Sequence, residues 1–507
     1  GTAFDVATYQ YDNTRAGVNP SETALTPANV NSTVFGKIGF YPVDGPIDGQ
    51  PLYLSQVVIP SKGTHNIVYA VTEKDSVYAY EADHANILWQ VSLLGAGETP
   101  SDDHGCPSQV SPDIGITSTP VIDRNMGPHG ALYTVAMSKD SSGKYFQRVH
   151  ALDLTTGAEL FNGPTVVQAS FPGTGQGSVG GNVIFDPGQY KERVGLLLSN
   201  GILYTMWASH CDYLPYTGWI IGYDASTLAQ AQVLNITPNG AWGAVWMSGA
   251  APAADLNGDI YFLDGNGTFD TTLDTNGFPI DHDFGNSFIR LSTTGTLQVA
   301  DYFTMFNTAD ETAIDQDLGS GGAAVLVDVL DNSHNLHQLA IGAGKDKVIY
   351  IVDRVMMGKF NAATNNIYQE VTGALNHGVF SKPAYFNNTI YFGAVSDNIR
   401  AFQISNAFLS ASSSSQSGGT YQYPGATPTI SANGISNAIV WAVEDSSPAV
   451  LHAYDATNLA NELYNSNQAS GSRDHFTTVD KFIVPIVTSG KVFVGTTSGI
   501  AVFGLLP

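Results

Sequence analysis

The sequence predicts an all-β fold made of eight similar repeats. Glycine (53 residues), tyrosine (24) and phenylalanine (24) are abundant, which favours short strands joined by turns. A unit of about 60 residues recurs, with an apolar first strand that often contains proline, two further strands, and a fourth after a turn rich in Thr, Gly or Asn. Four antiparallel strands need about that length, so we expect an eight-bladed β-propeller with four strands in each blade.

The repeats are most easily located from the first strand. Recognisable copies begin near Gln50, Ser118, Ala251, Lys382, Thr427 and Val484. Two weaker copies, at about 190–235 and 320–370, bring the count to eight. The third strand often ends in Ala-x-Asp or a similar sequence, as in segments 77–80, 149–153, 220–224 and 451–455.

The segment 34–43 has the pattern of a strand but no partners in its own unit. We expect it to close the ring by pairing with the final strands, 491–495 and 500–505, since closure removes exposed strand edges. The expected organisation is therefore a single domain with an N-terminal segment (1–33), a closing strand (34–43) and the blades (44–507). The Ser- and Gly-rich stretch 409–419 is expected to be a loop within one blade.

Composition restricts the class of partner and the compartment. The chain has 20 Lys and Arg against 45 Asp and Glu, a formal net charge of −25, which disfavours nucleic acid and anionic lipid. No apolar run reaches the roughly 18 residues of a spanning helix. The sequence begins at Gly1-Thr-Ala without a signal peptide, as a mature secreted protein would. We expect a monomer that is extracellular, or periplasmic if bacterial.

Cysteines and glycosylation sequons are consistent with that compartment. The two cysteines, Cys106 and Cys211, favour one disulfide under oxidising conditions, with metal binding as the weaker alternative. Four Asn-x-Ser/Thr sequons permit glycosylation in a eukaryotic source, at Asn31, Asn235, Asn266 and Asn387.

One face of the disc gathers the unusual residues. In a propeller, the loops between the second and third strands emerge on the same face as the connections between blades. That rule places segments 101–106 and 209–212 together, so the two cysteines could meet there. The same face is expected to carry segments 264–287, 309–322 and 471–478, together with Lys345 and His377.

Several blocks in order along the chain resemble the quinoprotein alcohol dehydrogenases, eight-bladed propellers that use pyrroloquinoline quinone (PQQ) and a bound cation. Segments 12–15 and 25–30 resemble that family's N-terminal segment. Ala151-Leu-Asp153 with Thr156-Gly157 is similar to its blade-docking motif. Segment 264–267 resembles its Gly-Asn block, and Lys345-x₄-Tyr350-Ile-Val-Asp-Arg354 resembles its Lys…Tyr-x-x-Asp-Arg block.

The resemblance implies a cation site and a cofactor site. The cation ligands would be Asp212, Asn266 and Asp315, and Asp317 resembles the additional ligand of the lanthanide-using branch, so the cation would be Ca²⁺ or a lanthanide. Asp315 would also be the catalytic base, and Lys345 would contact the quinone. Trp246 resembles the aromatic floor under the cofactor, with Trp242 as second choice, and Cys106, Cys211 and His377 would lie beside it.

These residue types suit the chemistry that the resemblance implies. Hard cations prefer carboxylate and carbonyl oxygens, and the cation polarises a quinone carbonyl as a Lewis acid. A nearby carboxylate takes the alcohol proton while hydride leaves for the cofactor. Lys345 would stabilise negative charge that develops on the reduced quinone.

The chain also departs from the family pattern. The adjacent Cys-Cys pair that covers the quinone is absent, and a Cys106–Cys211 bridge would either replace it or only hold loops together. Asp212 stands where the family usually has the longer Glu, and a glycan on Asn266 would abolish metal binding. No Cys-x-x-Cys-His haem motif is present, so electrons would pass to a separate acceptor.

Each candidate residue also has a plain structural interpretation. Asp315 and Asp317 can be solvated loop acids, Asp212 and Asn266 turn residues, Lys345 a surface lysine and Trp246 a core residue. The acids of segment 270–283 can form a separate Ca²⁺ loop, although they lack EF-hand spacing.

Two other functions stay open. Five histidines map to the same face (His104, His210, His282, His377 and His475), which suits a cofactor-free propeller that degrades polysaccharides, as a lyase or hydrolase, with histidine as base and Ca²⁺ neutralising a uronate. A non-catalytic propeller that binds glycans or protein is the third alternative. Aromatic residues available for stacking on sugars are Tyr213, Tyr216, Tyr421 and Tyr423.

Overall fold

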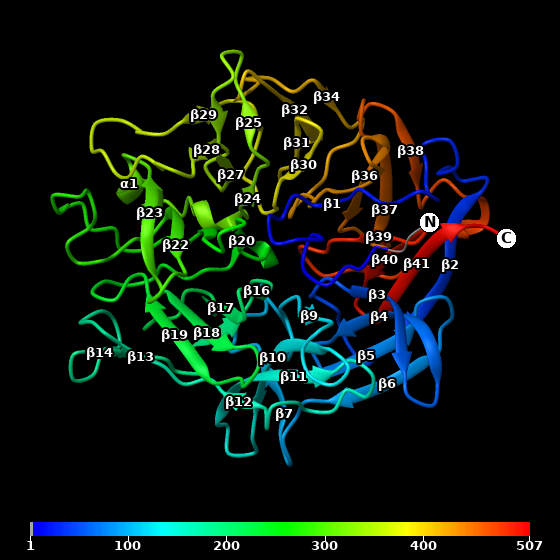
Figure 1. The fold of residues 1–507 in the computed structure, drawn as a ribbon, viewed down its shortest axis with the longest axis horizontal. Helices are drawn as coiled ribbons and strands as arrows, with labels where there is room; N and C mark the ends of the chain where they lie inside the picture. Colours follow the sequence, from blue (N-terminus) through cyan, green and yellow to red (C-terminus); the bar gives the residue numbers. More distant parts are fainter. Residues whose placement is uncertain (1–3) are drawn as a thin grey trace.

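The chain folds as an eight-bladed β-propeller, as the sequence predicts. The structure is a computed structural model that describes residues 4–507. The sheets are arranged around a central axis, and the chain passes from blade to blade around the ring (Figure 1). Most strands are buried on both faces, and the sheets pack face to face through apolar clusters shared by neighbouring blades.

The first four blades are antiparallel sheets whose strands run outward from the axis. Blade 1 contains β3 (Leu52–Ile59), β4 (Gly63–Val71), β5 (Ser76–Glu81) and β6 (Ile87–Ser92). Blade 2 contains β9 (Val121–Asp123), β10 (Ala131–Lys139), β11 (Tyr145–Asp153) and β12 (Thr165–Val166). Blade 3 has an interrupted inner strand, β15 (Tyr190–Glu192) and β16 (Leu197–Ser199), then β17 (Ile202–Ser209), β18 (Trp219–Asp224) and β19 (Gln230–Asn235). Blade 4 contains β20 (Ala253–Ala254), β21 (Ile260–Leu263), β22 (Ser287–Ser292) and β23 (Gln298–Thr304).

The remaining blades follow the same order. Blade 5 contains β24 (Ala324–Val325), β27 (Leu339–Ala343), β28 (Ile349–Asp353) and β29 (Gln369–Val371). Blade 6 contains β30 (Ala384–Phe386), β31 (Thr389–Gly393), β32 (Ile399–Ser405), β33 (Phe408–Leu409) and β34 (Ser415–Gln416). Blade 7 contains β35 (Thr429–Asn433), β36 (Ser436–Glu444), β37 (Val450–Asp455) and β38 (Glu462–Asn465). Blade 8 contains β39 (Ile486–Thr488), β40 (Lys491–Gly495), β41 (Gly499–Leu505) and β2 (Phe35–Pro42).

The N-terminal strand β2 closes the ring, which confirms the predicted closure. It pairs antiparallel with β41, from Phe35 opposite Leu505 to Pro42 opposite Gly499. Figure 1 shows β2, coloured blue, lying beside β41, coloured red. The last blade therefore takes its outer strand from the start of the chain, so the two ends of the chain are held together by a sheet.

The rest of the N-terminal segment crosses the centre of the ring (Figure 1). Between Phe4 and Asn19 it makes hydrogen bonds to the innermost strand of every blade, with partners Tyr53, Ile122, Leu198, Ala254, Val325, Tyr385, Ile430 and Val487. Its short strand β1 (Val18–Asn19) pairs in parallel with β35. Arg15 is fully buried there and donates to Pro252 O at 2.9 Å and to Tyr9 O at 2.8 Å.

Tyrosines in the strands link neighbouring blades. Tyr69 Oη donates to Leu154 O at 3.1 Å, Tyr133 Oη to Ala225 O at 2.7 Å, and Tyr391 Oη to Ala456 O at 2.8 Å. Each acceptor immediately follows the aspartate that ends the third strand of the next blade. A buried hydroxyl needs a partner, so this repeated bond accounts for the buried tyrosines.

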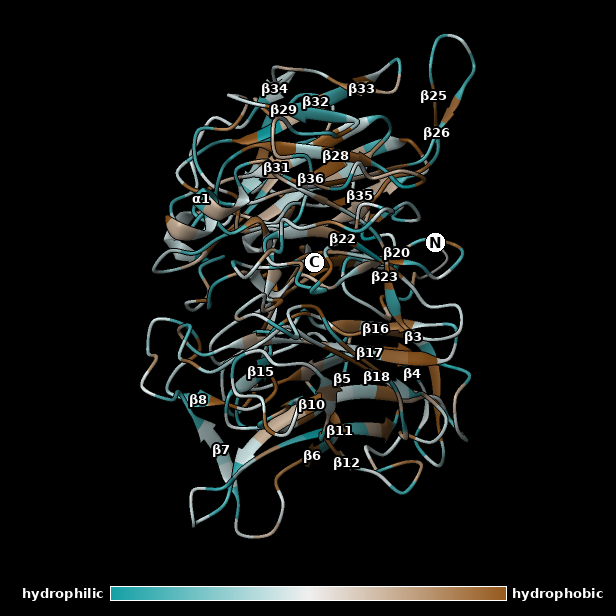
Figure 2. Cartoon of the chain, turned by 90° about the vertical axis from the view of Figure 1, so that its left-hand side faces the viewer, coloured by the Kyte–Doolittle hydropathy of each residue, from teal (hydrophilic) through white to brown (hydrophobic). Residues whose placement is uncertain are grey.

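The two faces of the disc differ. Figure 2 shows the helix α1 (Thr308–Ala313) and the hairpin β7 (Thr99–Asp102) and β8 (Asp113–Ile114) on one face. The opposite face carries the protruding hairpin of β25 (Val329–Leu330) and β26 (Leu336–His337). A further hairpin joins β13 (Ser170–Pro172) to β14 (Asn182–Ile184). No helix within residues 4–507 has the length and apolarity needed to cross a membrane.

Candidate functional site

A cavity of about 560 Å³ lies among the loops on the face that carries α1. Its walls come from connections between successive blades and from loops that join second and third strands. Asp212 belongs to the β17–β18 loop, Trp246 to the connection from blade 3 to blade 4, and Lys345 to the β27–β28 loop. The cavity therefore collects side chains that are far apart in the sequence.

Four of the residues named from the sequence are in direct contact. Lys345 Nζ lies 2.8 Å from Asp315 Oδ1 and 2.6 Å from Asp317 Oδ2. Asn266 donates its side-chain N–H to Asp315 Oδ1 at 2.9 Å and its backbone N–H to Asp317 Oδ1 at 2.6 Å. The backbone also joins them, because Lys345 N donates to Asp317 O at 2.9 Å. Blades 4 and 5 thus contribute one acid–amide–lysine cluster.

The two aspartates of this cluster have different surroundings. The Asp315 side chain is 70% exposed, whereas that of Asp317 is 10% exposed. Burial raises the pKa of Asp317 to about 6, although the charge of Lys345 opposes this rise. Burial alone would lower the pKa of Lys345, but the charges and hydrogen bonds of Asp317 and Asp315 outweigh it and raise that pKa. Lys345 is therefore a charged ammonium held between two acids.

Backbone strain accompanies the site. Asp315 directly follows the C-cap of α1 and has φ of 61°, and Cys211 and Asp212 have φ of 46° and 56°. The left-handed region after a helix is usually taken by Gly or Asn, and left-handed backbone at other residues concentrates at functional sites. Left-handed backbone thus places Cys211, Asp212 and Asp315 in the cavity wall, a conformation that loop residues of other blades also adopt.

An aromatic wall borders the cluster. The Trp246 ring lies 5.7 Å from Lys345 Nζ and 5.9 Å from the Phe380 ring. Phe380 is in turn 5.3 Å from Tyr423. Trp246 lines the same cavity as the cluster, whereas Trp242, the second choice, lines a different cavity.

Three further basic residues of the cavity were not identified from the sequence. Lys191, Arg193 and Lys481 line it together with Lys345, so four of the 20 Lys and Arg residues meet in one cavity of an acidic chain. Lys191 and Arg193 are two residues apart at β15, and side chains at that spacing point to the same side of a strand. The Lys-x-Arg alternation was the available signal, since basic residues are scarce elsewhere.

These three cations have few acidic partners. Arg193 is 3.9 Å from Asp48. Lys191 donates to Gln109 Oε1, and Lys481 Nζ donates to Ser108 O at 2.5 Å. Across residues 4–507, no carboxylate forms a salt bridge with Lys191 or Lys481. This side of the cavity therefore offers positive charge to an anionic ligand.

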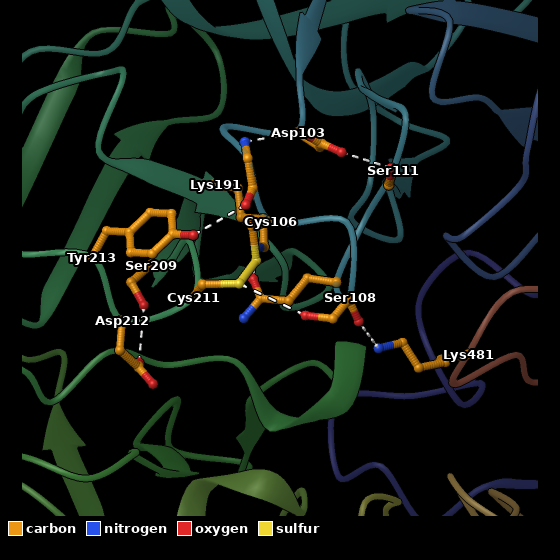
Figure 3. Close-up of a disulfide and its surroundings, with 12 residues drawn as sticks. Asp103, Cys106, Ser108, Ser111, Lys191, Ser209, Cys211, Asp212, Tyr213 and Lys481 are labelled. Atoms are coloured by element: carbon orange, nitrogen blue, oxygen red, sulfur yellow. Dashed lines mark hydrogen bonds between the residues drawn. A yellow bond between two sulfur atoms is a disulfide. The ribbon is translucent and has the colours of Figure 1, made fainter.

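A disulfide joins Cys106 to Cys211, which confirms the predicted pairing (Figure 3). The Cα atoms are 5.8 Å apart, and the bridge links the β7–β8 loop to the β17–β18 loop. Cys211 lines the cavity, and Ser108 Oγ lies 3.7 Å from its sulfur. The bridge therefore fixes the wall that holds Ser108, whose carbonyl accepts from Lys481, as Figure 3 shows.

The histidines do not gather at this cavity. His377 and His282 are exposed and His475 is partly exposed, and none of the three lines the cavity. His104 and His210 stack at 3.9 Å beside the disulfide and line a separate pocket. His210 is buried, and burial lowers its pKa to about 2.

The other sequence-based candidates have structural roles. Asp274 and Asp283 of the acidic loop each accept backbone N–H groups. Asn235 is 2% exposed and donates to Thr217 Oγ1, so that sequon is not accessible to a glycan. Tyr216 and Tyr421 are buried, while Tyr213 and Tyr423 are 48% and 49% exposed.

The acid–amide–lysine cluster contains oxygen donors of the kind that a hard cation prefers. Asn266 Oδ1 is buried and has no hydrogen-bond partner, and it lies in the cluster of Asp315 and Asp317. An oxygen donor left unpaired beside two carboxylates matches the preference of Ca²⁺ and lanthanides. Asp212 lines the same cavity, with Oδ1 accepting from Tyr216 Oη at 2.8 Å. Within the described chain, no three His, Cys, Asp or Glu side chains form a ready-made metal group.

The fold is an eight-bladed propeller similar to those of quinoprotein alcohol dehydrogenases. The chain superposes on a quinohemoprotein alcohol dehydrogenase from Comamonas testosteroni with a TM-score of 0.63 and 13% identity, covering 99% of this chain and 80% of that one. A second such enzyme, from Pseudomonas putida HK5, gives 0.62 and 12%, with the same coverage. A europium-containing methanol dehydrogenase gives 0.59 and 11%, covering 99% and 98%.

These comparisons confirm the predicted fold resemblance. No protein-family model matches the sequence, and no curated protein matches it. At such low identity the likeness establishes the fold, and function has to be argued from the site.

Proposed function

We propose that this protein is a secreted dehydrogenase that binds PQQ and a cation and oxidises an alcohol or a sugar. The observation that carries the proposal is the cavity itself. It combines an aromatic wall, basic residues in a chain of net charge −25, and the Asp315–Asp317–Lys345 cluster, which Asn266 contacts through hydrogen bonds. The quinone dehydrogenases named above have the same fold.

The cavity suits a planar, polyanionic cofactor. PQQ is a flat aromatic tricarboxylate, and Trp246 offers the ring face that such a molecule stacks on. Lys481 supplies charge without a salt-bridged carboxylate, and Arg193, although 3.9 Å from Asp48, can bind a further carboxylate in bidentate fashion. Cys211 closes another side of the cavity, in place of the adjacent cysteine pair of the family that the sequence resembles.

The cation would be held by Asp315, Asp317 and Asn266, with Asp212 from the facing loop. All four provide hard oxygen donors, and the unpaired Oδ1 of Asn266 is the donor that a cation would satisfy. The family resemblance implies Ca²⁺ or a lanthanide. The second aspartate, Asp317, favours the more highly charged ion.

The chemistry assigned to the chain is proton transfer and charge stabilisation. When bound, the quinone would accept hydride from the alcohol carbon. Asp315, whose side chain is exposed to the cavity, would take the alcohol proton on a carboxylate oxygen. Lys345 would place its ammonium against the negative charge that the reduced cofactor carries. Electrons would then leave to a separate acceptor, because the sequence has no haem-binding motif.

The direct test is a titration of the protein with PQQ in the presence of Ca²⁺ or La³⁺, followed by tryptophan fluorescence and by dye-linked oxidation of an alcohol and sugar panel. We expect quenching with micromolar affinity or better, and turnover that falls at least 100-fold in Asp315→Ala. Arg193→Met should weaken binding at least tenfold, whereas Lys62→Met, on an exposed surface loop, should not change it. No quenching with either metal would refute the proposal.

The polysaccharide alternative has one supporting observation. A uronate polymer is anionic, and the cations of the cavity would also attract it. The five histidines that suggested this activity do not line the cavity, however. Cleavage of polyuronate by protein free of quinone, lost in Arg193→Met, would favour this function over the dehydrogenase.

A further inference from the structure

Lys191 is a buried amine that faces the cavity and has no anionic partner. It lies on β15, is 3% exposed and lines the cavity beside Cys211. Its Nζ donates to the amide oxygen of Gln109. Among residues 4–507, no carboxylate is within salt-bridge distance of it. The proposed dehydrogenase chemistry gives it no task.

Two cations and two acids act on Lys191, and neither acid forms a salt bridge with it. Arg193 follows directly after the end of β15, and Lys481 comes from the connection to blade 8. His104 and His210, whose pKa values are lowered chiefly by burial, are near enough for the charge of Lys191 to lower them further. The acids that act on it from a distance are Glu73 and Asp212. Burial first, and then the charge of Arg193, lower the pKa of Lys191 to about 7.

Lys345, in the same cavity, differs from Lys191 in its partners and in the direction of its pKa shift. Lys345 is held by Asp315 and Asp317 and has a raised pKa, so it stays protonated and cannot act as a nucleophile. A lysine that is desolvated or placed next to another cation is the kind that attacks carbonyl groups. The two lysines are therefore suited to different chemistry.

The neighbours of Lys191 also indicate the charge of the compound that it would meet. Arg193 packs over the Phe482 ring at 5.2 Å, and Lys481 lies 5.7 Å from both Phe482 and Tyr423. These contacts hold the two cations at the cavity wall. A small molecule with a carboxylate would bind to Arg193 and Lys481, and a carbonyl group on it would then lie near the amine.

We propose that Lys191 forms an imine with anionic aldehydes or 2-oxo acids that enter this cavity. The amine lone pair of Nζ forms a bond to the carbonyl carbon, and the carbonyl π electrons move to oxygen, which takes a proton from water. The hydroxide left from that water takes one N–H proton, and the resulting carbinolamine then loses its hydroxyl group together with the second N–H proton as water, which gives a C=N bond. No oxidant or reductant is consumed.

This inference does not depend on the proposed dehydrogenase function. It needs only the amine, the two cations and the cavity, all of which belong to the protein without cofactor. A quinone bound at Arg193 and Lys481 would compete for the same cations, so PQQ should protect Lys191 if the dehydrogenase proposal also holds. Failure of PQQ to bind would leave the reaction of Lys191 unaffected.

The test is reductive trapping on the full chain. The protein is incubated at pH 7 with limiting glyoxylate and sodium cyanoborohydride, and modified lysines are mapped by peptide mass spectrometry. About half of an amine with a pKa near 7 is neutral at that pH, against about one in 2,500 of ordinary lysines. Allowing for lower nucleophilicity and for burial, we expect Lys191 to be labelled at least tenfold faster than the mean of the surface lysines.

Two comparisons separate the proposed site from general lysine reactivity. Lys382 is also buried, with a pKa lowered by burial to about 7, but it donates to the backbone oxygens of Arg15 and Pro383 and lines none of the cavities described above. It should stay unmodified. Acetaldehyde, which has no carboxylate, should label Lys191 at least fivefold more slowly than glyoxylate does.

The mapping in the unaltered protein makes the test independent of whether variants fold. Lys191→Arg should abolish labelling of its peptide while keeping the wild-type melting temperature. Labelling spread evenly over exposed lysines, an adduct on Lys481 in place of Lys191, or equal rates with glyoxylate and acetaldehyde would overturn the proposal.

Discussion

A group of buried carboxyls should make the stability of this propeller fall as pH rises. Asp48, Glu73 and Asp480 come from the region where blades 7, 8 and 1 meet. Asp48 Oδ1 and Glu73 Oε1 are buried without hydrogen-bond partners. Burial raises the pKa of each of the three carboxyls to about 7, with repulsion among them adding to the effect and Arg193 opposing it.

The direction in which the free energy of unfolding changes with pH follows from proton binding by these three carboxyls. Their pKa values in the unfolded chain are about 4, so between about pH 4 and pH 7 the folded state holds more protons than the unfolded state. The free energy of unfolding is then highest at the acidic end of this window and decreases as pH rises. One such group contributes at most about 1.4 kcal/mol per pH unit. Because the three share one arginine, we expect a total decrease of about 2–4 kcal/mol from pH 5 to pH 7.

The measurement is urea unfolding at pH 5, 6 and 7 for the wild type, Asp480→Asn and Glu73→Gln. Each amide variant removes one titrating group, so the decrease in unfolding free energy should shrink by about 1–2 kcal/mol. Other buried acids, such as Asp264 and Asp283, titrate in all three proteins and cancel in the comparison. An unchanged pH dependence in both variants would refute the reasoning, and the exposed Asp140→Asn is the control.

Three further predictions concern the framework of the site. Replacing Cys106 and Cys211 by serine should lower the unfolding free energy by up to about 5 kcal/mol, because the bridge closes a loop with a sequence separation of 105; an unchanged urea midpoint would contradict this. Arg15→Met should lower the unfolding free energy by about 3–5 kcal/mol in the same assay, since it leaves buried carbonyl acceptors without a donor. A decrease below about 1 kcal/mol would show that Arg15 does not hold the N-terminal segment at the centre of the ring. Gly267→Ala would place its Cβ 2.5 Å from Gly243 N and shift the adjacent Asn266. The affinity for PQQ, measured by fluorescence titration, should therefore fall at least tenfold. An unaltered affinity would show that Asn266 is not part of the binding site.

Much of the fold was predictable because its signals are local. Pairs of short alternating strands and turns at a regular spacing indicate blades wherever they occur in the chain. The unpaired segment at 34–43 indicated closure, and β2 does pair with β41. The role of the segment before it was not predictable, because its bonds to all eight blades depend on where their innermost strands lie.

The candidate site was only partly predictable. Family-like blocks pointed to Asp212, Trp246, Asp315, Asp317 and Lys345, and these line one cavity. Nothing in the blocks indicated Arg193, Lys481 or Phe380, because Lys481 and Phe380 come from two different connections between blades and Arg193 from the interrupted inner strand of blade 3. His377 was expected on the right face, but its side chain is exposed outside the cavity.

The sequence by itself determined the all-β repeat, the number of blades, the ring closure and the face on which the loops would gather. These follow from strand periodicity and turn chemistry, which act between near neighbours. The tertiary structure alone decided which charges would meet. It placed Lys345 between two aspartates and Lys191 among cations, and burial and neighbouring charge, which no local pattern contains, give these two identical side chains opposite protonation behaviour.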